Sequence, residues 1–275
     1  MADPIETTGT PAVPATVAAA VPATTAPANY GAGVEGLEDI DTSDLSMPQL
    51  KIVHDQALFE DSLSGEQFDT MDVILLGLIK QRVLWPSEMG EEAEAPLCRS
   101  YNFTEGVPGE KFGERMKRDP ASPLEASGYT EADVLAGHLS CLSCNLKEWG
   151  SHPSRDVPWC VEQFVLAVMI GSPDEPIGSP AMLTLQRSSI KPAKAYITSF
   201  VRTRTPLFVN RTTMSLNGQS RGTVKYSIPK FVKGVPTDAE YHGDYAELYR
   251  QVKDFVTTPR VAEEETAVTV TATPA

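Results

Sequence analysis

The chain has 275 residues and a formal net charge of −14, with 23 Lys and Arg against 37 Asp and Glu. No apolar run approaches the roughly 20 residues of a membrane-spanning helix, and no basic segment precedes the short run 17–21, which argues against a bilayer span or a secretory signal. We therefore expect a cytoplasmic protein that has no membrane partner and whose four cysteines bind metal rather than form disulfides.

Both ends of the chain differ in composition from its middle. Residues 1–46 begin as an Ala-, Thr- and Pro-rich stretch and then become acidic, and residues 257–275 are rich in Thr with an acidic run at 263–265. Small side chains and repeated prolines bury too little apolar surface to offset the entropy of ordering. We expect two disordered tails around one folded domain at 47–256.

The hydrophobic pattern predicts six strands and three helices in chain order. Residues 68–85 and 161–170 contain the longest apolar runs, which is typical of strands buried on both faces, with Gly77 marking a bend or bulge in the first. A cap at Thr130 with Asp133 predicts one short helix. The expected strands are 47–54, 68–85, 161–170, 181–186, 207–216 and 223–231, and the expected helices are 130–135, 188–201 and 237–255.

This order indicates a mainly β protein, a β-rich α+β fold that suits an OB-type Greek-key barrel. The polar segment at about 87–160 would be an inserted zinc-binding lobe, and a C-terminal helix would open with a capping box from Thr237 to Glu240. A turn at Asn217-Gly218 would join the last two strands. A β-sandwich with a zinc lobe fits the pattern nearly as well.

The four cysteines are the candidate metal ligands. Cys141 and Cys144 form a Cys-x-x-Cys pair, fifteen residues separate Cys144 from Cys160, and 42 residues separate Cys98 from Cys141. Two residues between cysteines let both sulfurs face one ion, and four thiolates around Zn²⁺ make a closed structural site. Four unrelated buried thiols, or a redox pair, are the alternatives, and the lone histidines His138 and His152 are rival ligands.

Several enzyme classes lack their required residues. A zinc deaminase needs His-x-Glu before its Pro-Cys-x-x-Cys, whereas here His138 is followed by Leu and Ser. The basic part of the chain holds no clustered carboxylates for Mg²⁺, and no Gly-x-x-x-x-Gly-Lys-Ser phosphate loop is present. We therefore expect a binding protein without catalytic residues.

Residues 176–237 contain ten Lys or Arg and no Asp or Glu, in contrast to the acidic flanks. A surface that only needs solubility mixes both signs of charge, whereas one that faces phosphates excludes carboxylates. Aromatic residues alternate with these cations, as in single-strand binding grooves. The candidate nucleic-acid-binding residues are Arg187, Lys191, Lys194, Tyr196, Arg202, Arg204, Arg211, Arg221 and Lys225.

Two alternatives remain open for this stretch. The cations could instead neutralise the acidic flanks of the same molecule. Tyr196 suits base stacking and core packing equally, and the same choice holds for Trp149 and Trp159 beside the cysteines. If the last strand is regular, Lys225 and Tyr226 point to opposite faces, so only one of them can meet a ligand.

The segments "MPQLKIVHD", "CRSYNF", "CLSCNLKEWGSHPSRDVPWC" and "QRSSIKPAKAYITSF" resemble single-stranded DNA-binding proteins of tailed bacteriophages. The resemblance covers about 48–256. It implies that Cys98, Cys141, Cys144 and Cys160 bind zinc and that residues 188–194 belong to the DNA-binding surface. It also implies a role in phage DNA replication or recombination in the host cytoplasm, alongside other replication or recombination proteins.

The expected function is therefore sequence-independent binding of single-stranded DNA. Two other functions fit the same residues. One is a zinc-stabilised interaction or assembly protein whose basic face meets an acidic partner, and the other is a strand-annealing recombination mediator.

Overall fold

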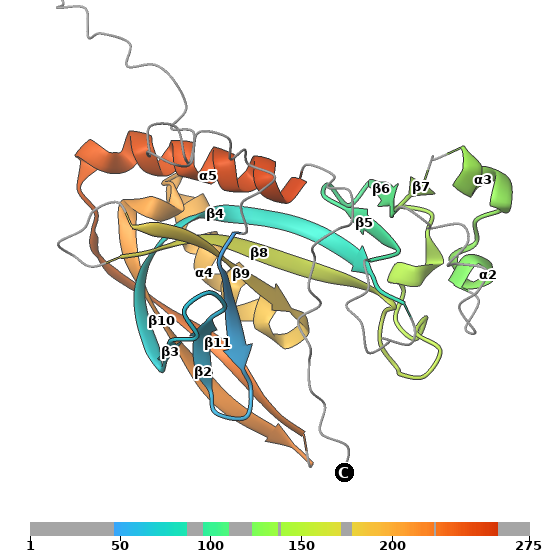
Figure 1. Ribbon diagram of the computed structural model, residues 1–275, viewed down its shortest axis with the longest axis horizontal. Helices are drawn as coiled ribbons and strands as arrows, with labels where there is room; N and C mark the ends of the chain where they lie inside the picture. The colour runs from blue at the N-terminus through green and yellow to red at the C-terminus, as the bar shows by residue number, and fades with distance from the viewer. Residues whose placement is uncertain are drawn as a thin grey trace, which may run out of the picture. The chain divides into compact units, whose positions relative to one another are not determined.

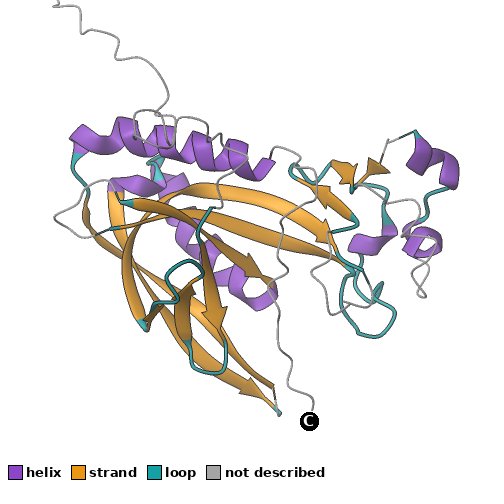
Figure 2. Ribbon diagram, viewed as in Figure 1, coloured by secondary structure: helices purple, strands orange, loops and turns teal. Residues whose placement is uncertain are grey.

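A computed structural model of the chain describes residues 47–86, 96–109, 123–136, 139–171, 178–222 and 224–257. The expected disordered tails at 1–46 and 257–275 lie outside these residues, except for Thr257. The described chain is mainly β, and Figures 1 and 2 show its strands in a curved mixed sheet with helices packed against it.

Eleven strands make up the described sheet. Their bounds are β1 Gln49–Val53, β2 Leu58–Asp61, β3 Gln67–Phe68, β4 Thr70–Leu84, β5 Cys98–Ser100, β6 Glu105–Pro108, β7 Leu139–Ser140, β8 Cys160–Ile170, β9 Ser179–Gln186, β10 Asn210–Arg221 and β11 Val224–Pro236. The α-helices are α2 Pro123–Ser127, α3 Glu131–Leu135, α4 Ile190–Thr203 and α5 His242–Thr257. Short 3-10 turns are η1 Asn145–Lys147, η2 Arg187–Ser189, η3 Leu207–Val209 and η4 Ala239–Tyr241.

The sheet runs in the order β3-β2-β1-β9-β8-β4-β5-β6-β7, and β10 with its partner β11 joins at β4. All described pairs are antiparallel except β1 with β9. No pairing among the described strands closes the sheet. The mainly β class and the C-terminal helix are confirmed, but the OB-type barrel is not.

Strand β4 connects the parts of the sheet. One edge pairs with β8 along most of its length, while the other pairs first with β10, from Thr70 to Ile74, and then with β5, from Arg82 to Leu84. The expected apolar strands at 68–85 and 161–170 correspond to β4 and β8, which explains their continuous apolar runs. Both strands are covered on two faces.

Two helices cover opposite faces of this sheet. Helix α4 buries Ile190, Ala193 and Phe200, and the first two belong to the core cluster that contains Leu75 and Leu183. Helix α5 packs on the other face, where Tyr245 and Val252 join Ile74, Val165 and Ala167. The helical spacing of apolar residues in both segments predicted these helices.

Several local predictions were wrong or incomplete. The chain continues as strand through Asn217-Gly218, and the reversal lies at Gly222, whose φ is +62°. The α5 segment starts with η4, capped by Asp238, while the Thr237 hydroxyl donates to the carbonyl of Phe208 at 2.6 Å instead of capping a helix. Strand β2 was not predicted, and neither were β5, β6, β7 and α2 in the polar insertion.

The capping box at Thr130 is confirmed. The Thr130 hydroxyl accepts from the Asp133 N–H at 3.2 Å, and the Asp133 carboxylate accepts from the Thr130 N–H at 2.8 Å. Two otherwise unsatisfied N–H groups at the start of α3 are thereby bonded.

Gly77 lies at a β-bulge, where the register of β4 against β8 shifts between Leu75 and Gly77. A Cβ on Gly77 would lie 2.2 Å from Cε2 of Tyr249, whose hydroxyl donates to the carbonyl of Leu78 at 2.8 Å. Glycine is therefore required at position 77, because the Tyr249 ring of α5 occupies the space that any other side chain would need.

We expect the substitution Gly77→Ala to lower the free energy of unfolding by about 1–3 kcal/mol, since the Tyr249 ring must leave its place or α5 must move away from the sheet. Thermal denaturation followed by circular dichroism measures this. The control is Gly243→Ala in α5, where a Cβ meets nothing within 4 Å. An unchanged melting temperature for Gly77→Ala would contradict the role assigned to Tyr249.

Candidate zinc lobe and basic surface

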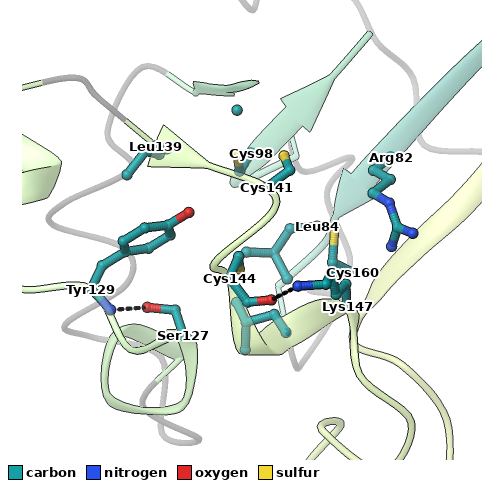
Figure 3. Close-up of a pocket in the computed structure, with 12 residues that line it drawn as sticks. Arg82, Leu84, Cys98, Ser127, Tyr129, Leu139, Cys141, Cys144, Lys147 and Cys160 are labelled. Carbon is teal, nitrogen blue, oxygen red and sulfur yellow. Dashed lines mark hydrogen bonds between the residues drawn. The ribbon is translucent and has the colours of Figure 1, made fainter. Parts of the chain in front are cut away.

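The four cysteines come together at the end of the sheet formed by β4 and β8 (Figure 3). Cys98 begins β5, Cys160 begins β8, and Cys141 and Cys144 lie just after β7. All four line one small cavity of about 30 Å³. The fold thus brings together cysteines as far apart in the chain as Cys98 and Cys160. None of the four forms a disulfide.

Local hydrogen bonds shape the Cys141–Cys144 turn. The N–H groups of Ser143 and Cys144 both donate to the carbonyl of Ser140, each at 3.2 Å. Lys147 donates its Nζ to the carbonyls of Leu142 at 2.6 Å and Cys144 at 3.2 Å. The two residues between the cysteines therefore form a tight turn, as a metal knuckle requires.

Gly106 leaves space for one of the sulfurs. A Cβ on Gly106 would lie 3.0 Å from Cys98 Sγ, which is closer than side chains normally approach. The strand β6 can therefore pass directly beside the cavity only because position 106 carries no side chain.

The thiols affect one another electrostatically. Burial raises the pKa of Cys98, and the neighbouring Cys160, Cys141 and Cys144 raise it further. Burial, with Cys144 and Cys141 nearby, raises the pKa of Cys160 to about 12, against an opposing effect of Arg82. Cys98 and Cys160 therefore keep their protons unless a cation lies beside them, and a bound metal ion would reverse the shift.

The raised pKa of Cys144, which arises first from burial, also bears on the redox alternative. Redox-active Cys-x-x-Cys thiols have lowered pKa values, because the thiolate is the nucleophile. Cys144 is shifted in the other direction, so Cys144 itself is not an activated nucleophile of this kind.

Among the described residues, no three His, Cys, Asp or Glu side chains are already set at metal-binding geometry. Zinc binding would therefore require the four Sγ atoms to converge to Zn–S distances of about 2.3 Å. Each sulfur moves by rotation about a single χ1 torsion. Four cysteine sulfurs are ligands that zinc prefers, and all four lie around one cavity. The residues present therefore fit a zinc ion.

The lobe around the cysteines has a small apolar core of five buried residues: Leu84, Leu97, Leu139, Leu146 and Trp159. Trp159 is 2% exposed and donates its Nε1 to the carbonyl of Trp85 at 3.0 Å, so it packs inside the lobe. Trp149 is 71% exposed. Of the two rival ligands, His152 is buried with its Nε2 2.7 Å from Nη2 of Arg155, and it does not line the cysteine cavity. His138 lies outside the described residues.

The basic residues from 187 to 233 lie on two neighbouring structures, the α4 region and the β10–β11 hairpin. Arg187 lies in η2, directly before α4, and its pKa is lowered by burial and by the positive charge of Arg155. Lys191, Lys194 and Arg202 are exposed on α4, and Arg204 follows as its left-handed C-cap residue. Lys225, Lys230 and Lys233 are exposed on β11.

Two of the nine candidate residues have structural roles. Arg211 is 9% exposed and donates its Nε to the Asp72 carboxylate at 2.6 Å and its Nη2 to the carbonyl of Gly171 at 2.9 Å. Tyr196 bonds the hydroxyl of Thr212 at 2.8 Å and stacks on Phe231 with ring centroids 5.5 Å apart. Arg211 therefore holds β10 to β4, whereas Tyr196 is half-buried: it packs against the core and also lines an open groove.

Lys194 forms an exposed ion pair with Glu162 at 3.2 Å and lies over the ring of Phe164. Such surface pairs stabilise a protein by only about 0–1 kcal/mol. The Arg221 side chain lies outside the described part of the structure. The remaining cations form no ion pair with any described residue: Arg187, Lys191, Arg202, Arg204, Lys225, Lys230 and Lys233.

An open groove of about 470 Å³ runs between α4 and the hairpin. The helix contributes Pro192, Ala195, Tyr196 and Ser199 to its wall. The hairpin contributes Asn217, Ile228, Pro229, Lys230 and Phe231. None of these lining residues is acidic, and sequence periodicity alone did not reveal the groove because it depends on how α4 packs against β11.

Two further cations border the helix side of this groove. Lys191 precedes Ala195 by four residues, and Arg202 follows Ser199 by three, so both lie on the helix face that carries Ala195 and Ser199. On β11, alternation places Lys225 on the face of Pro229 and Phe231, and Tyr226 on the opposite face. Of that pair, Lys225 shares the face that meets α4.

Comparison of the chain with protein-family models, curated proteins and solved structures found no match. No helix among the described residues has the length and apolar character to cross a membrane. The candidate function is therefore argued from the residues and their arrangement.

Proposed function

We propose that this protein binds single-stranded DNA without sequence preference, as the phage resemblance implies, and acts in replication or recombination in the host cytoplasm. The observation that carries the proposal is a group of cations on α4 and β11 that, Lys194 apart, form no ion pair with a described residue and lie around a groove whose lining residues include no carboxylate. An acidic protein of net charge −14 that keeps one such surface has a site suited to a polyanion.

The cations are arranged to follow a flexible backbone. They come from a helix and an adjacent strand, and they lie on exposed side chains that can reach phosphates at varied spacing. Phosphate contacts of this kind carry no sequence information, so the expected binding is independent of base order.

We further propose that Cys98, Cys141, Cys144 and Cys160 hold one structural zinc ion that stabilises the lobe from β5 to the start of β8. Zinc supplies a fixed tetrahedral crosslink when four thiolates bind it. Arg82 and Lys147 also line the cavity, and their positive charges would offset the surplus negative charge of four thiolates around one Zn²⁺.

The test of DNA binding is a fluorescence titration of the full chain with labelled oligo-dT at several salt concentrations. We expect the logarithm of the binding constant to fall linearly with the logarithm of salt concentration, with a slope of about −0.7 for each phosphate contacted. Binding that is indifferent to salt between about 50 and 200 mM would contradict the proposal. A strand-annealing assay on the same protein distinguishes coating of single strands from annealing.

A further inference from the structure

The groove between α4 and β11 is more than a basic surface, because it is hollow and mostly apolar inside. Its volume of about 470 Å³ is open to solvent, so it suits one part of a larger ligand rather than an enclosed small molecule. Pro192, Ala195, Ile228 and Pro229 make apolar walls on its two sides. A phosphate chain alone would need only the cations and would gain nothing from such walls.

Two stacked rings form another part of the wall. Tyr196 and Phe231 lie 5.5 Å apart at 25° to each other, and the edge of Phe200 packs on Tyr196 at 5.2 Å. The Tyr196 hydroxyl is fixed by Thr212, so the rings are held in place before any ligand binds. A fixed aromatic wall costs little entropy on binding and suits a flat, apolar ligand face.

Polar groups occur at the groove in small number. Ser199 and Asn217 supply a hydroxyl and an amide, and Lys230 supplies a positive charge. Lys191 and Arg202 border the same helix face. A ligand that matches this set has a flat apolar body, polar edges and an attached negative charge.

We propose that this groove receives a nucleobase of the bound DNA strand, while Lys191 and Arg202 on the helix side contact the phosphates on either side of it. The inference rests on the proposed function and adds to it, since cation contacts alone require no base. Apolar walls and the Tyr196–Phe231 stack take up the base without reading its identity, and Ser199 and Asn217 bond its edge.

The test compares oligo-dT with an abasic oligonucleotide of the same length, which carries the same phosphates without bases. We expect the wild-type full chain to bind oligo-dT about tenfold or more tightly, because base contacts add to phosphate contacts. Both oligonucleotides should keep the same salt slope. Equal affinity for the two, with salt-dependent binding retained, would overturn the inference and leave the proposed function standing.

The substitution Ala195→Leu fills the groove without changing any charge. Ala195 is exposed, and leucine is a good helix former, so the variant is expected to fold. It should bind oligo-dT no better than the abasic strand, with abasic affinity unchanged. The matched control is Thr198→Leu, exposed on α4 but not lining the groove, which should keep the tenfold preference.

An Ala195→Leu protein that retains the preference for bases would overturn the inference, because the base would then lie elsewhere. Failure of the wild-type chain to bind either oligonucleotide would reject the proposed function and this inference together. The two failures are therefore distinguishable in one set of titrations.

Discussion

Replacing Cys144 with serine is expected to release a zinc ion and to unfold the cysteine lobe while the central sheet remains folded. Metal analysis should find about one zinc per wild-type chain and none in the variant. The lobe has only five buried apolar residues of its own core, so a bound zinc ion would supply much of its folding free energy, of order 10 kcal/mol for structural zinc sites. The two larger core clusters contain no cysteine.

Tryptophan fluorescence reports the change directly. Trp159 is buried within the lobe, so its emission should shift to longer wavelength when Cys144→Ser or a chelator removes the metal. Trp149 is already exposed and should contribute little to the shift. The control is Ser143→Ala, in the same turn, which should keep both the zinc and the buried emission.

The outcome that contradicts the zinc site is a wild-type protein without metal whose four thiols react with a thiol reagent equally fast before and after chelation. In that case the four cysteines would be neighbouring reduced thiols in a small core. Retention of oligo-dT binding by Cys144→Ser is also expected, because the cations of α4 and β11 lie outside the lobe.

Removing two cations from α4 is expected to weaken DNA binding strongly. In the variant Lys191→Gln/Arg202→Gln, two phosphate contacts are lost, so the salt slope should become shallower by about 1.4 and affinity should fall roughly 25-fold near 0.1 M salt. Both side chains are exposed, and neither forms an ion pair with a described residue, so stability should change little.

The matched control carries the same change of charge on the other helix. Arg250→Gln/Lys253→Gln removes one arginine and one lysine from exposed positions of α5, on the opposite face of the sheet. Its oligo-dT affinity and salt slope should remain close to those of the wild type. Equal losses in both variants would mean that net charge, rather than a localised surface, governs binding.

The sequence predicted those elements whose signal is local. The apolar runs of β4 and β8, the helical spacing in α4 and the Thr130 cap depend on neighbours within a few residues, and each was confirmed. The predicted turn at Asn217-Gly218 was wrong, because the strand continues in register with its partner, from Asn217 opposite Ile228 to Arg221 opposite Val224. Strand pairing thus overrode a favourable turn sequence.

In the candidate site, too, residues close in the chain were predictable and contacts between distant residues were not. The structure places the Cys141–Cys144 pair with Cys98 and Cys160 around one cavity, and zinc binding by these residues stays a prediction. The structural role of Arg211 was not predictable from charge pattern, because its partner Asp72 lies 139 residues earlier in the chain. The groove likewise arises from the packing of α4 on β11, which no local pattern encodes.

The long strand β4 has a mechanical consequence. Its first residues pair with the hairpin β10–β11, and its last residues pair with β5 beside the cysteines, so one continuous backbone spans both regions. Around the bulge at Gly77, β4 pairs with β8 alone among the described strands, so the cysteine lobe and the β10–β11 hairpin are joined through one backbone and one partner strand. Tension applied by a bound DNA strand to the hairpin would therefore be transmitted along β4 to the lobe.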